Sequence, residues 1–329
     1  MRSSAFLASG CAVVVFAAAA ATSEPPISVP EPPLVQPQLA LPEVLVQAPE
    51  PRYVAPTRRD RIGRIWAPVL INGQGPFRLV LDTGASHSAV IERVAQALGV
   101  PQKESAILLH GVTGSARVPS IQAERFEIGD VIAAPAVLPI VEDAFGGAEG
   151  VLGTEGLGDM RIVIEFNADR ITIARSHYQR AGPDFSVIPL KFIFGRVPMI
   201  AARVGSIPVQ AIIDTGAQGT TGNLALRDLL LRRRTPPNVE MDDVVGVTLD
   251  VQHGNAVIVP EIALGSVTLR RARVTFVDLD ILSQWKMQDK PMLVIGMDIL
   301  GLLDTLVIDY RRREIQVRLK RFGAEGSSS

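Results

Sequence analysis

From residue 62 onward, short apolar runs alternate with polar residues and are separated by glycine-containing turns, a pattern typical of β-strands. Residues 65–71 lead through Asn72-Gly73, a strong hairpin turn signal, into residues 77–81. The same pattern recurs over residues 197–213, with Gly205-Ser206 at the turn. The main part of the chain is therefore predicted to be all-β.

Two short helices are predicted within this β pattern. The first covers residues 90–98 and is closed by Gly99. The second covers residues 224–231 and occupies the corresponding place after the second hairpin.

The β pattern is an internal repeat, because its landmarks occur twice in the same order. The first copy contains a hairpin, Asp82-Thr83-Gly84-Ala85, Gly111-Val112-Thr113, Val151-Leu152-Gly153, and two strands over residues 161–166 and 170–173. The second copy contains a hairpin, Asp214-Thr215-Gly216-Ala217, Gly246-Val247-Thr248, Val294-Ile295-Gly296, and two strands over residues 305–310 and 314–317. The repeat predicts two lobes, residues 57–180 and 181–322, with a disordered tail over 323–329.

Each copy places a carboxylate at the end of an apolar strand. These residues are Asp82 and Asp214, which lie 214 − 82 = 132 positions apart. A charge beside a core is costly unless it is hydrogen-bonded or functional. The following glycine allows a tight turn, and the strand holds the carboxyl rigidly. Two such turns could meet tip to tip and present two carboxyls to one water.

The order of hairpin, Asp-Thr-Gly-Ala, glycine-containing hairpin tip and apolar-Gly strand resembles the aspartic proteases, in particular the retroviral-type (retropepsin-like) ones. Here two copies are fused, as in the two-lobed pepsins, and the resemblance covers residues 62 to about 319. It implies a bilobal acid-protease fold, with lobes related by a pseudo-twofold axis and flaps that close over an extended peptide. The export signal described below resembles that of bacterial periplasmic members.

The resemblance also implies roles for particular residues. Asp82 and Asp214 would form the catalytic dyad jointly. The supporting residues would be Thr83 and Thr215, which lock the turns together, Gly84 and Gly216, which let backbone amides approach the carboxylates, and Ala85 and Ala217, which complete the turns. The substrate-binding flaps would carry Gly111, Val112, Thr113, Gly246, Val247 and Thr248.

The chain departs from the pepsin pattern at Ala85 and Ala217, where pepsins usually carry a hydroxyl residue that donates to a carboxylate. Our hypothesis is that the pKa values of the dyad are less depressed and that activity extends closer to neutral pH. A pH–rate profile confined below about pH 4 would refute it. The second copy also contains extra residues, 278–291 including Trp285, which we interpret as a lid or substrate-contacting loop.

Composition excludes several classes of partner. The 329 residues carry a net charge of −1 and only 5% aromatic residues, so nothing indicates binding to nucleic acid. The four histidines are too scattered for a metal site, and no metal or cofactor is predicted. The only cysteine, Cys11, lies in the leader, so the remaining chain has no thiol nucleophile or disulfide.

The N-terminal part predicts export. Residues 1–22 combine Arg2, an apolar run and small residues, which is typical of a secretory signal. Three alternatives stay open: a cleaved signal, an uncleaved anchor that tethers the protein to the membrane, and a lipid attachment site at Cys11. Residues 23–56 form a Pro-rich linker, interpreted as a semi-rigid spacer. We expect an exported protein, periplasmic or secreted.

Two functions follow from these observations. The first is an aspartic endopeptidase that cleaves extended protein or peptide segments. The second is a peptide-binding module on a protease fold that does not cleave. The similar lobe lengths and the short connection over residues 176–186 favour a monomer whose two lobes close on each other.

Overall fold

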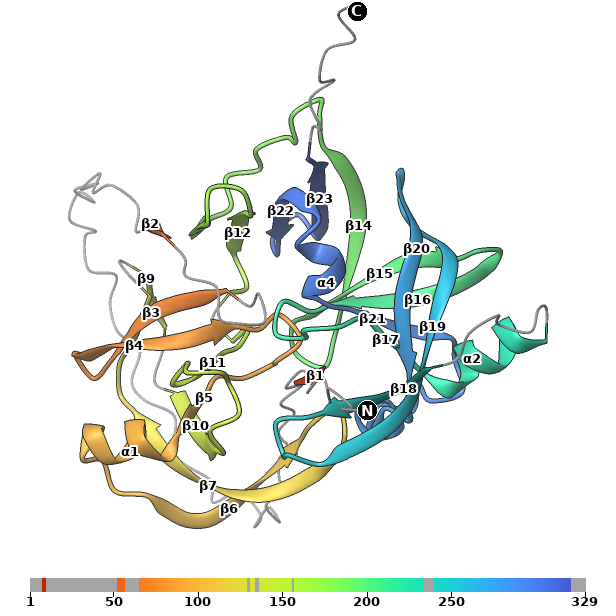
Figure 1. Cartoon of the computed structure of the whole chain (residues 1–329). Helices are drawn as coiled ribbons and strands as arrows, with labels where there is room; N and C mark the ends of the chain where they lie inside the picture. The colour runs from red at the N-terminus through yellow and green to blue at the C-terminus, as the bar shows by residue number, and fades with distance from the viewer. Residues whose placement is uncertain are drawn as a thin grey trace, which may run out of the picture.

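The computed structural model describes residues 8–9, 52–56, 65–128, 131–133, 136–155, 157–232 and 240–320. Most of the expected leader (1–22), most of the Pro-rich linker (23–56) and the tail (323–329) lie outside the described residues. The described part is bilobal and all-β, with two large sheets and four short helices (Figure 1). The predicted fold class is therefore confirmed.

Lobe 1 is built on a nine-stranded sheet with the order β6-β7-β10-β5-β11-β4-β3-β8-β9. Its elements are β3 (Trp66–Ile71), β4 (Gln74–Leu81), β5 (Ala89–Ile91), α1 (Glu92–Leu98), β6 (Lys103–His110), β7 (Ser115–Ala123), β8 (Phe126–Ile128), β9 (Val131–Ala133), β10 (Ala136–Val141) and β11 (Gly150–Leu152). The predicted hairpin is formed by β3 and β4. Asn72 and Gly73 both have positive φ values, 51° and 76°, as its two-residue turn requires.

The helix of lobe 1 begins two residues later than predicted. Val90 and Ile91 belong to β5, where Val90 pairs with both β10 and β11. These sheet hydrogen bonds override the helical pattern at the start of the segment. The helix ends as expected at Gly99, whose φ of 63° gives the left-handed cap that glycine favours.

Lobe 2 has the corresponding arrangement. Its elements are β15 (Val197–Val204), β16 (Ile207–Ile213), β17 (Thr221–Gly222), α2 (Leu224–Leu231), β18 (Glu240–Val245), β19 (Val251–Leu264), β20 (Val267–Phe276), α3 (Asp280–Gln284), β21 (Met292–Ile295) and α4 (Met297–Leu300). The predicted second helix is confirmed, and the Asn223 side chain caps it by accepting from Leu226 N at 3.1 Å. The two-residue strand β1 (Ala8–Ser9) pairs in parallel with β18.

Both lobes share one central feature, in which the strand that leads to the aspartate lies beside the apolar-Gly strand. In lobe 1, β4 pairs in parallel with β11, and Leu81 is the partner of Leu152. In lobe 2, β16 pairs in parallel with β21, and Ile213 is the partner of Ile295. These buried strands give each aspartate a rigid support.

A six-strand segment of the second sheet joins the lobes, in the order β2-β13-β12-β22-β23-β14. Its strands are β2 (Arg52–Pro56), β12 (Met160–Glu165), β13 (Arg170–Arg175), β14 (Ser186–Ile193), β22 (Leu303–Asp309) and β23 (Glu314–Leu319). At its centre β12 of lobe 1 pairs with β22 of lobe 2, with Val163 opposite Val307. In Figure 1 this segment lies at the top of the molecule, away from the β6–β7 hairpin at the bottom.

The strand β2 corrects one expectation. The sequence predicts a Pro-rich linker up to residue 56, yet residues 52–56 pair with all but one residue of β13. Tyr53, Val54 and Ala55 form a short β-prone stretch, and Pro56 is tolerated because β2 is the edge strand of its sheet.

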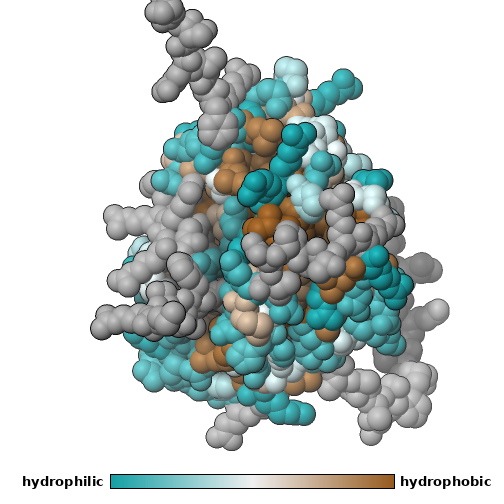
Figure 2. Space-filling view, turned by 45° about the vertical axis from the view of Figure 1, so that its right-hand side comes forward, coloured by the Kyte–Doolittle hydropathy of each residue, from teal (hydrophilic) through white to brown (hydrophobic). Residues whose placement is uncertain are grey.

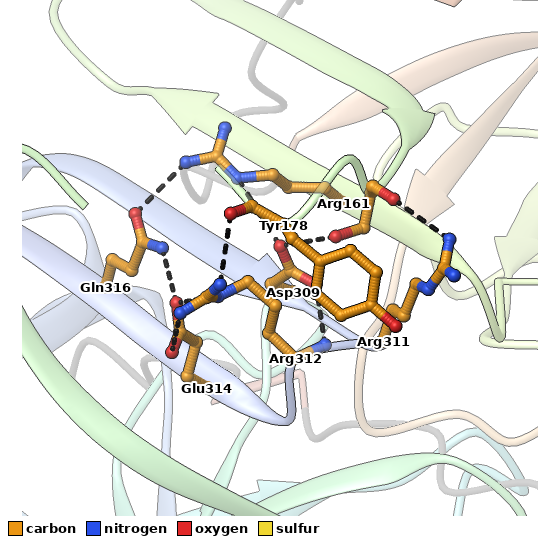
Figure 3. A network of polar contacts seen from close by, with 8 residues as sticks. Arg161, Tyr178, Asp309, Arg311, Arg312, Glu314 and Gln316 are labelled. Atoms are coloured by element: carbon orange, nitrogen blue, oxygen red, sulfur yellow. Dashed lines mark hydrogen bonds and ion pairs between the residues drawn. The ribbon is translucent and has the colours of Figure 1, made fainter. Parts of the chain in front are cut away.

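A polar network lies at the same junction (Figure 3). The Asp309 side chain is fully buried and accepts from the Ser176 hydroxyl at 2.8 Å and from Arg312 N at 2.9 Å. Arg161 of lobe 1 donates to Gln316 at 3.0 Å and lies 3.7 Å from the Asp309 carboxylate. Burial lowers the pKa of Arg161, whereas the neighbouring Asp309 and Glu314 raise it. The connection between the lobes is therefore fixed by polar contacts as well as by strand pairing.

The surface is mixed in character. On the face drawn in Figure 2, hydrophilic residues predominate and apolar residues gather in several separate areas. Large apolar side chains that are exposed in lobe 2 include Met241, Val251 and Ile258, from the strands β18 and β19. Among the residues that the structure describes, none of the helices has the length and hydrophobicity needed to span a bilayer.

Candidate active site

The two aspartates of the repeat lie at the ends of β4 and β16, each in a turn stabilised by its own carboxylate. Asp82 Oδ1 accepts from the backbone N–H groups of Gly84 at 2.8 Å and Ala85 at 3.0 Å. Asp214 Oδ1 accepts from Gly216 N at 2.9 Å and Ala217 N at 3.0 Å. Each carboxyl therefore has one oxygen held by its own turn.

The two turns meet so that each carboxyl packs against the glycine of the other turn. A Cβ atom added to Gly84 would lie closer than 3.0 Å to three atoms of the Asp214 carboxyl. A Cβ atom added to Gly216 would make the same overlap with Asp82. The structure thus brings together two carboxyls that are 132 positions apart, and only glycine leaves room for them at this point.

Two threonine hydroxyls connect the turns across the lobe boundary. Thr83 Oγ1 donates to Ile213 O at 2.7 Å and accepts from Thr215 N at 3.1 Å. Thr215 Oγ1 donates to Leu81 O at 2.7 Å and accepts from Thr83 N at 3.1 Å. Both threonines are fully buried, so these four bonds hold the two aspartate turns in a fixed relation.

Two hairpins correspond to the predicted flaps. We call β6–β7, with its tip at residues 111–114, flap 1, and β18–β19, with its tip at residues 246–250, flap 2. The predicted flap residues Gly111, Val112, Thr113, Gly246, Val247 and Thr248 all lie in these tips. The tip of flap 2 is one residue longer, and Leu249 there has a positive φ of 60°.

The tips of the flaps are packed against each other. A Cβ on Gly111 would lie 3.1 Å from Val247 Cγ1, and one on Gly246 would overlap the Thr113 side chain. The Gln252 side chain donates to Thr113 O at 3.3 Å. The exposed fraction is only 2% for Asp82 and 0% for Asp214, so both aspartates are buried.

Flap 1 also contacts the extra segment of lobe 2. Residues 278–291 contain the short helix α3, and Trp285 at its C-terminal end stacks on Phe194 with ring centroids 4.8 Å apart. At the start of α3, Asp280 Oδ2 accepts from the Ser115 hydroxyl at 3.2 Å, and Ser115 in turn contacts His110 Nδ1 at 2.8 Å. The inserted segment therefore contacts flap 1 directly beside its tip.

Some residues near the aspartates were not singled out from the sequence as site residues. Glu155 accepts a hydrogen bond from the end of the Asp82 turn, and Asp298 accepts one from the end of the Asp214 turn. Each lies two positions after the glycine of its apolar-Gly strand, Gly153 or Gly296. Tyr310 is buried, stacks on Phe192 with centroids 5.2 Å apart, and has its pKa raised mainly by burial, with smaller effects from Arg196 and Asp82. The equal spacing of Glu155 and Asp298 in the two copies is the sequence signal that could have indicated them. No sequence pattern indicates a role for Tyr310.

Within the described residues, no cluster of three or more His, Cys, Asp and Glu side chains is suited to hold a metal ion. The chemistry available at the site is that of two adjacent, buried carboxyls.

Comparison with protein families fits this geometry. Residues 67–155 and residues 200–299 each match the aspartyl protease family model, and together the two matches span more than half of the chain. The chain belongs to the aspartyl protease family. Each match contains one aspartate turn, so this member is retropepsin-like and carries two fused repeats in one chain. None of the curated proteins compared with the chain matches it.

Proposed function

We propose that this member of the aspartyl protease family is an endopeptidase that hydrolyses peptide bonds with Asp82 and Asp214 as a dyad. The observation that carries the proposal is the reciprocal packing of each carboxyl on the glycine of the other turn. Carboxyls this close cannot both be ionised near neutral pH, so the pair shares a proton and titrates as a unit.

The shared proton gives the pair two roles. The ionised partner takes a proton from a water molecule that attacks the scissile carbonyl, and the protonated partner donates a hydrogen bond to the carbonyl oxygen. The backbone N–H groups that donate to Oδ1 of Asp82 and of Asp214 hold both carboxyls in place for this step. The reaction needs no covalent intermediate.

The substrate in this proposal is an extended peptide between the dyad and the flaps. An extended segment can add to the strands of the flaps through backbone hydrogen bonds. Because the flap tips pack on each other and the aspartates are buried, we expect the tips to separate before such a peptide enters. The leader over residues 1–22 supports a place outside the cytoplasm, in the periplasm or beyond.

The test is cleavage of an unfolded protein and of a peptide library by the full chain, compared with Asp82→Asn and Asp214→Asn. Asp228→Asn is the matched control, because Asp228 is exposed on α2 and pairs there with Arg227. We expect cleavage by the wild type and by the control, and loss of cleavage in both dyad variants. Tight peptide binding by the wild type without cleavage would instead favour the binding module.

A further inference from the structure

The far end of each aspartate turn is bound by an acidic side chain from the other half of the same lobe. Six residues after Asp82, Ser88 N donates to Glu155 Oε1 at 2.5 Å. Six residues after Asp214, Thr220 donates to Asp298 through its N–H at 3.0 Å and through its hydroxyl at 2.7 Å. In both lobes, therefore, an acidic side chain accepts a hydrogen bond from the residue six positions after the aspartate.

These contacts complete a set of bonds that surround each turn. In lobe 1, Asp82 N donates to Leu152 O at 2.9 Å, Thr154 N donates to Ala85 O at 2.9 Å, and Gly153 N donates to the Ser88 hydroxyl at 3.0 Å. The turn is therefore held at its start, its middle and its end.

Lobe 2 repeats this set of bonds. Asp214 N donates to Ile295 O at 3.0 Å, Met297 N donates to Ala217 O at 2.8 Å, and Gly296 N donates to the Thr220 hydroxyl at 3.2 Å. In each lobe the acidic side chain supplies the last contact.

The two acidic groups differ in their surroundings. The two oxygens of Asp298 accept from Thr220 N, the Thr220 hydroxyl and Ile299 N. Burial raises the pKa of Asp298, although these hydrogen bonds lower it. Glu155 Oε2 is buried and has no hydrogen-bond partner among the described residues. A charged oxygen without donors is costly in such a place, and a protonated carboxyl costs less. Burial also raises the pKa of Glu155, although its contacts with Ser88 lower it.

We propose that Glu155 and Asp298 are positioning residues of the catalytic turns, Glu155 in its neutral form and Asp298 as a carboxylate. The inference rests on the proposed protease function for its effect on rate. Its structural content, the rigidity of the two turns, is independent of that function.

This assignment makes opposite predictions for two conservative changes. Glu155→Gln keeps an acceptor for Ser88 N and replaces a neutral acid by a neutral amide. Asp298→Asn replaces an oxygen that accepts by an NH₂ group, which would face one of the three donors. We therefore expect Glu155→Gln to behave like the wild type and Asp298→Asn to behave like an alanine variant.

The experiment measures two quantities on the full chain for Glu155→Gln, Glu155→Ala, Asp298→Asn and Asp298→Ala. The first is hydrogen exchange of the backbone amides in residues 83–88 and 215–220. We expect faster exchange over 83–88 in Glu155→Ala and over 215–220 in both Asp298 variants, with wild-type exchange in Glu155→Gln. The second is peptide cleavage, where the same three variants should lose about tenfold or more in kcat with a smaller change in KM, because a small misplacement of catalytic groups is costly.

Unchanged exchange over both turns in the alanine variants would overturn the proposal. If Glu155→Gln raises amide exchange and lowers kcat as much as Glu155→Ala does, the proposal that Glu155 acts in its neutral form is overturned. If the wild type does not cleave, the proposed function fails, and the exchange measurement still decides whether these residues hold the turns.

Discussion

Replacing Thr83 by valine should weaken the contact between the two aspartate turns. The valine has nearly the same shape but lacks the hydroxyl that donates to Ile213 O at 2.7 Å and accepts from Thr215 N at 3.1 Å. Thr83 has an exposed fraction of 0%, so no water can replace these bonds without rearrangement. Two buried backbone groups would lose their partner at about 1–3 kcal/mol each, which gives a loss of about 2–6 kcal/mol in the free energy of unfolding.

Chemical denaturation of the two proteins measures this loss, with Thr268→Val as the control. Thr268 is exposed on β20, so its variant should stay within about 0.5 kcal/mol of the wild type. The Thr83 variant should also lose peptide cleavage, because the dyad is no longer held in register. A loss of stability below about 1 kcal/mol, with cleavage intact, would refute the reasoning.

Three further changes have definite expected outcomes. Gly216→Ala places a methyl group on the Asp82 carboxyl and should lower kcat by about 100-fold or more, whereas Gly219→Ala, where a Cβ meets nothing within 4 Å, should not. Asp280→Ala removes a hydrogen bond from Ser115, which adjoins the flap 1 tip, so amide exchange at the tip should rise by about fivefold, the equivalent of about 1 kcal/mol; unchanged exchange would contradict this. Because the pKa of Glu155 is raised above 4.5, its contribution to stability is complete below that pH and is lost as pH rises through the raised value. In denaturation experiments between pH 4 and pH 8, the free energy of unfolding of Glu155→Gln should therefore rise relative to that of the wild type as pH increases. A difference between the two proteins that is the same at every pH would contradict the raised pKa as its cause.

The fold was largely predictable because both copies of the repeat contain the same landmarks in the same order. Each copy places an apolar strand before Asp82 or Asp214 and an apolar-Gly strand at a similar distance after it, and the structure pairs these strands in parallel in both lobes. The hairpin turn at Asn72-Gly73 was predictable for a local reason, since both residues tolerate a positive φ.

Features that depend on contacts between distant segments were not predictable. Residues 52–56 read as part of a Pro-rich spacer because composition cannot reveal an edge of the junction sheet. The packing of the flap tips on each other depends on how far the two lobes close, which no local pattern encodes. The roles of Glu155 and Asp298 were not predictable because the two copies carry different acidic residues at this position, and the two side chains differ in length.

The most direct test of the account is a double-mutant cycle on the dyad, with kcat measured for Asp82→Asn, Asp214→Asn and the variant that carries both changes. If the two carboxyls act on one water as a unit, each single change lowers kcat by at least about 100-fold, and the double change lowers it hardly further. Losses that multiply, or near wild-type cleavage by either single variant in a folded protein, would contradict a shared dyad.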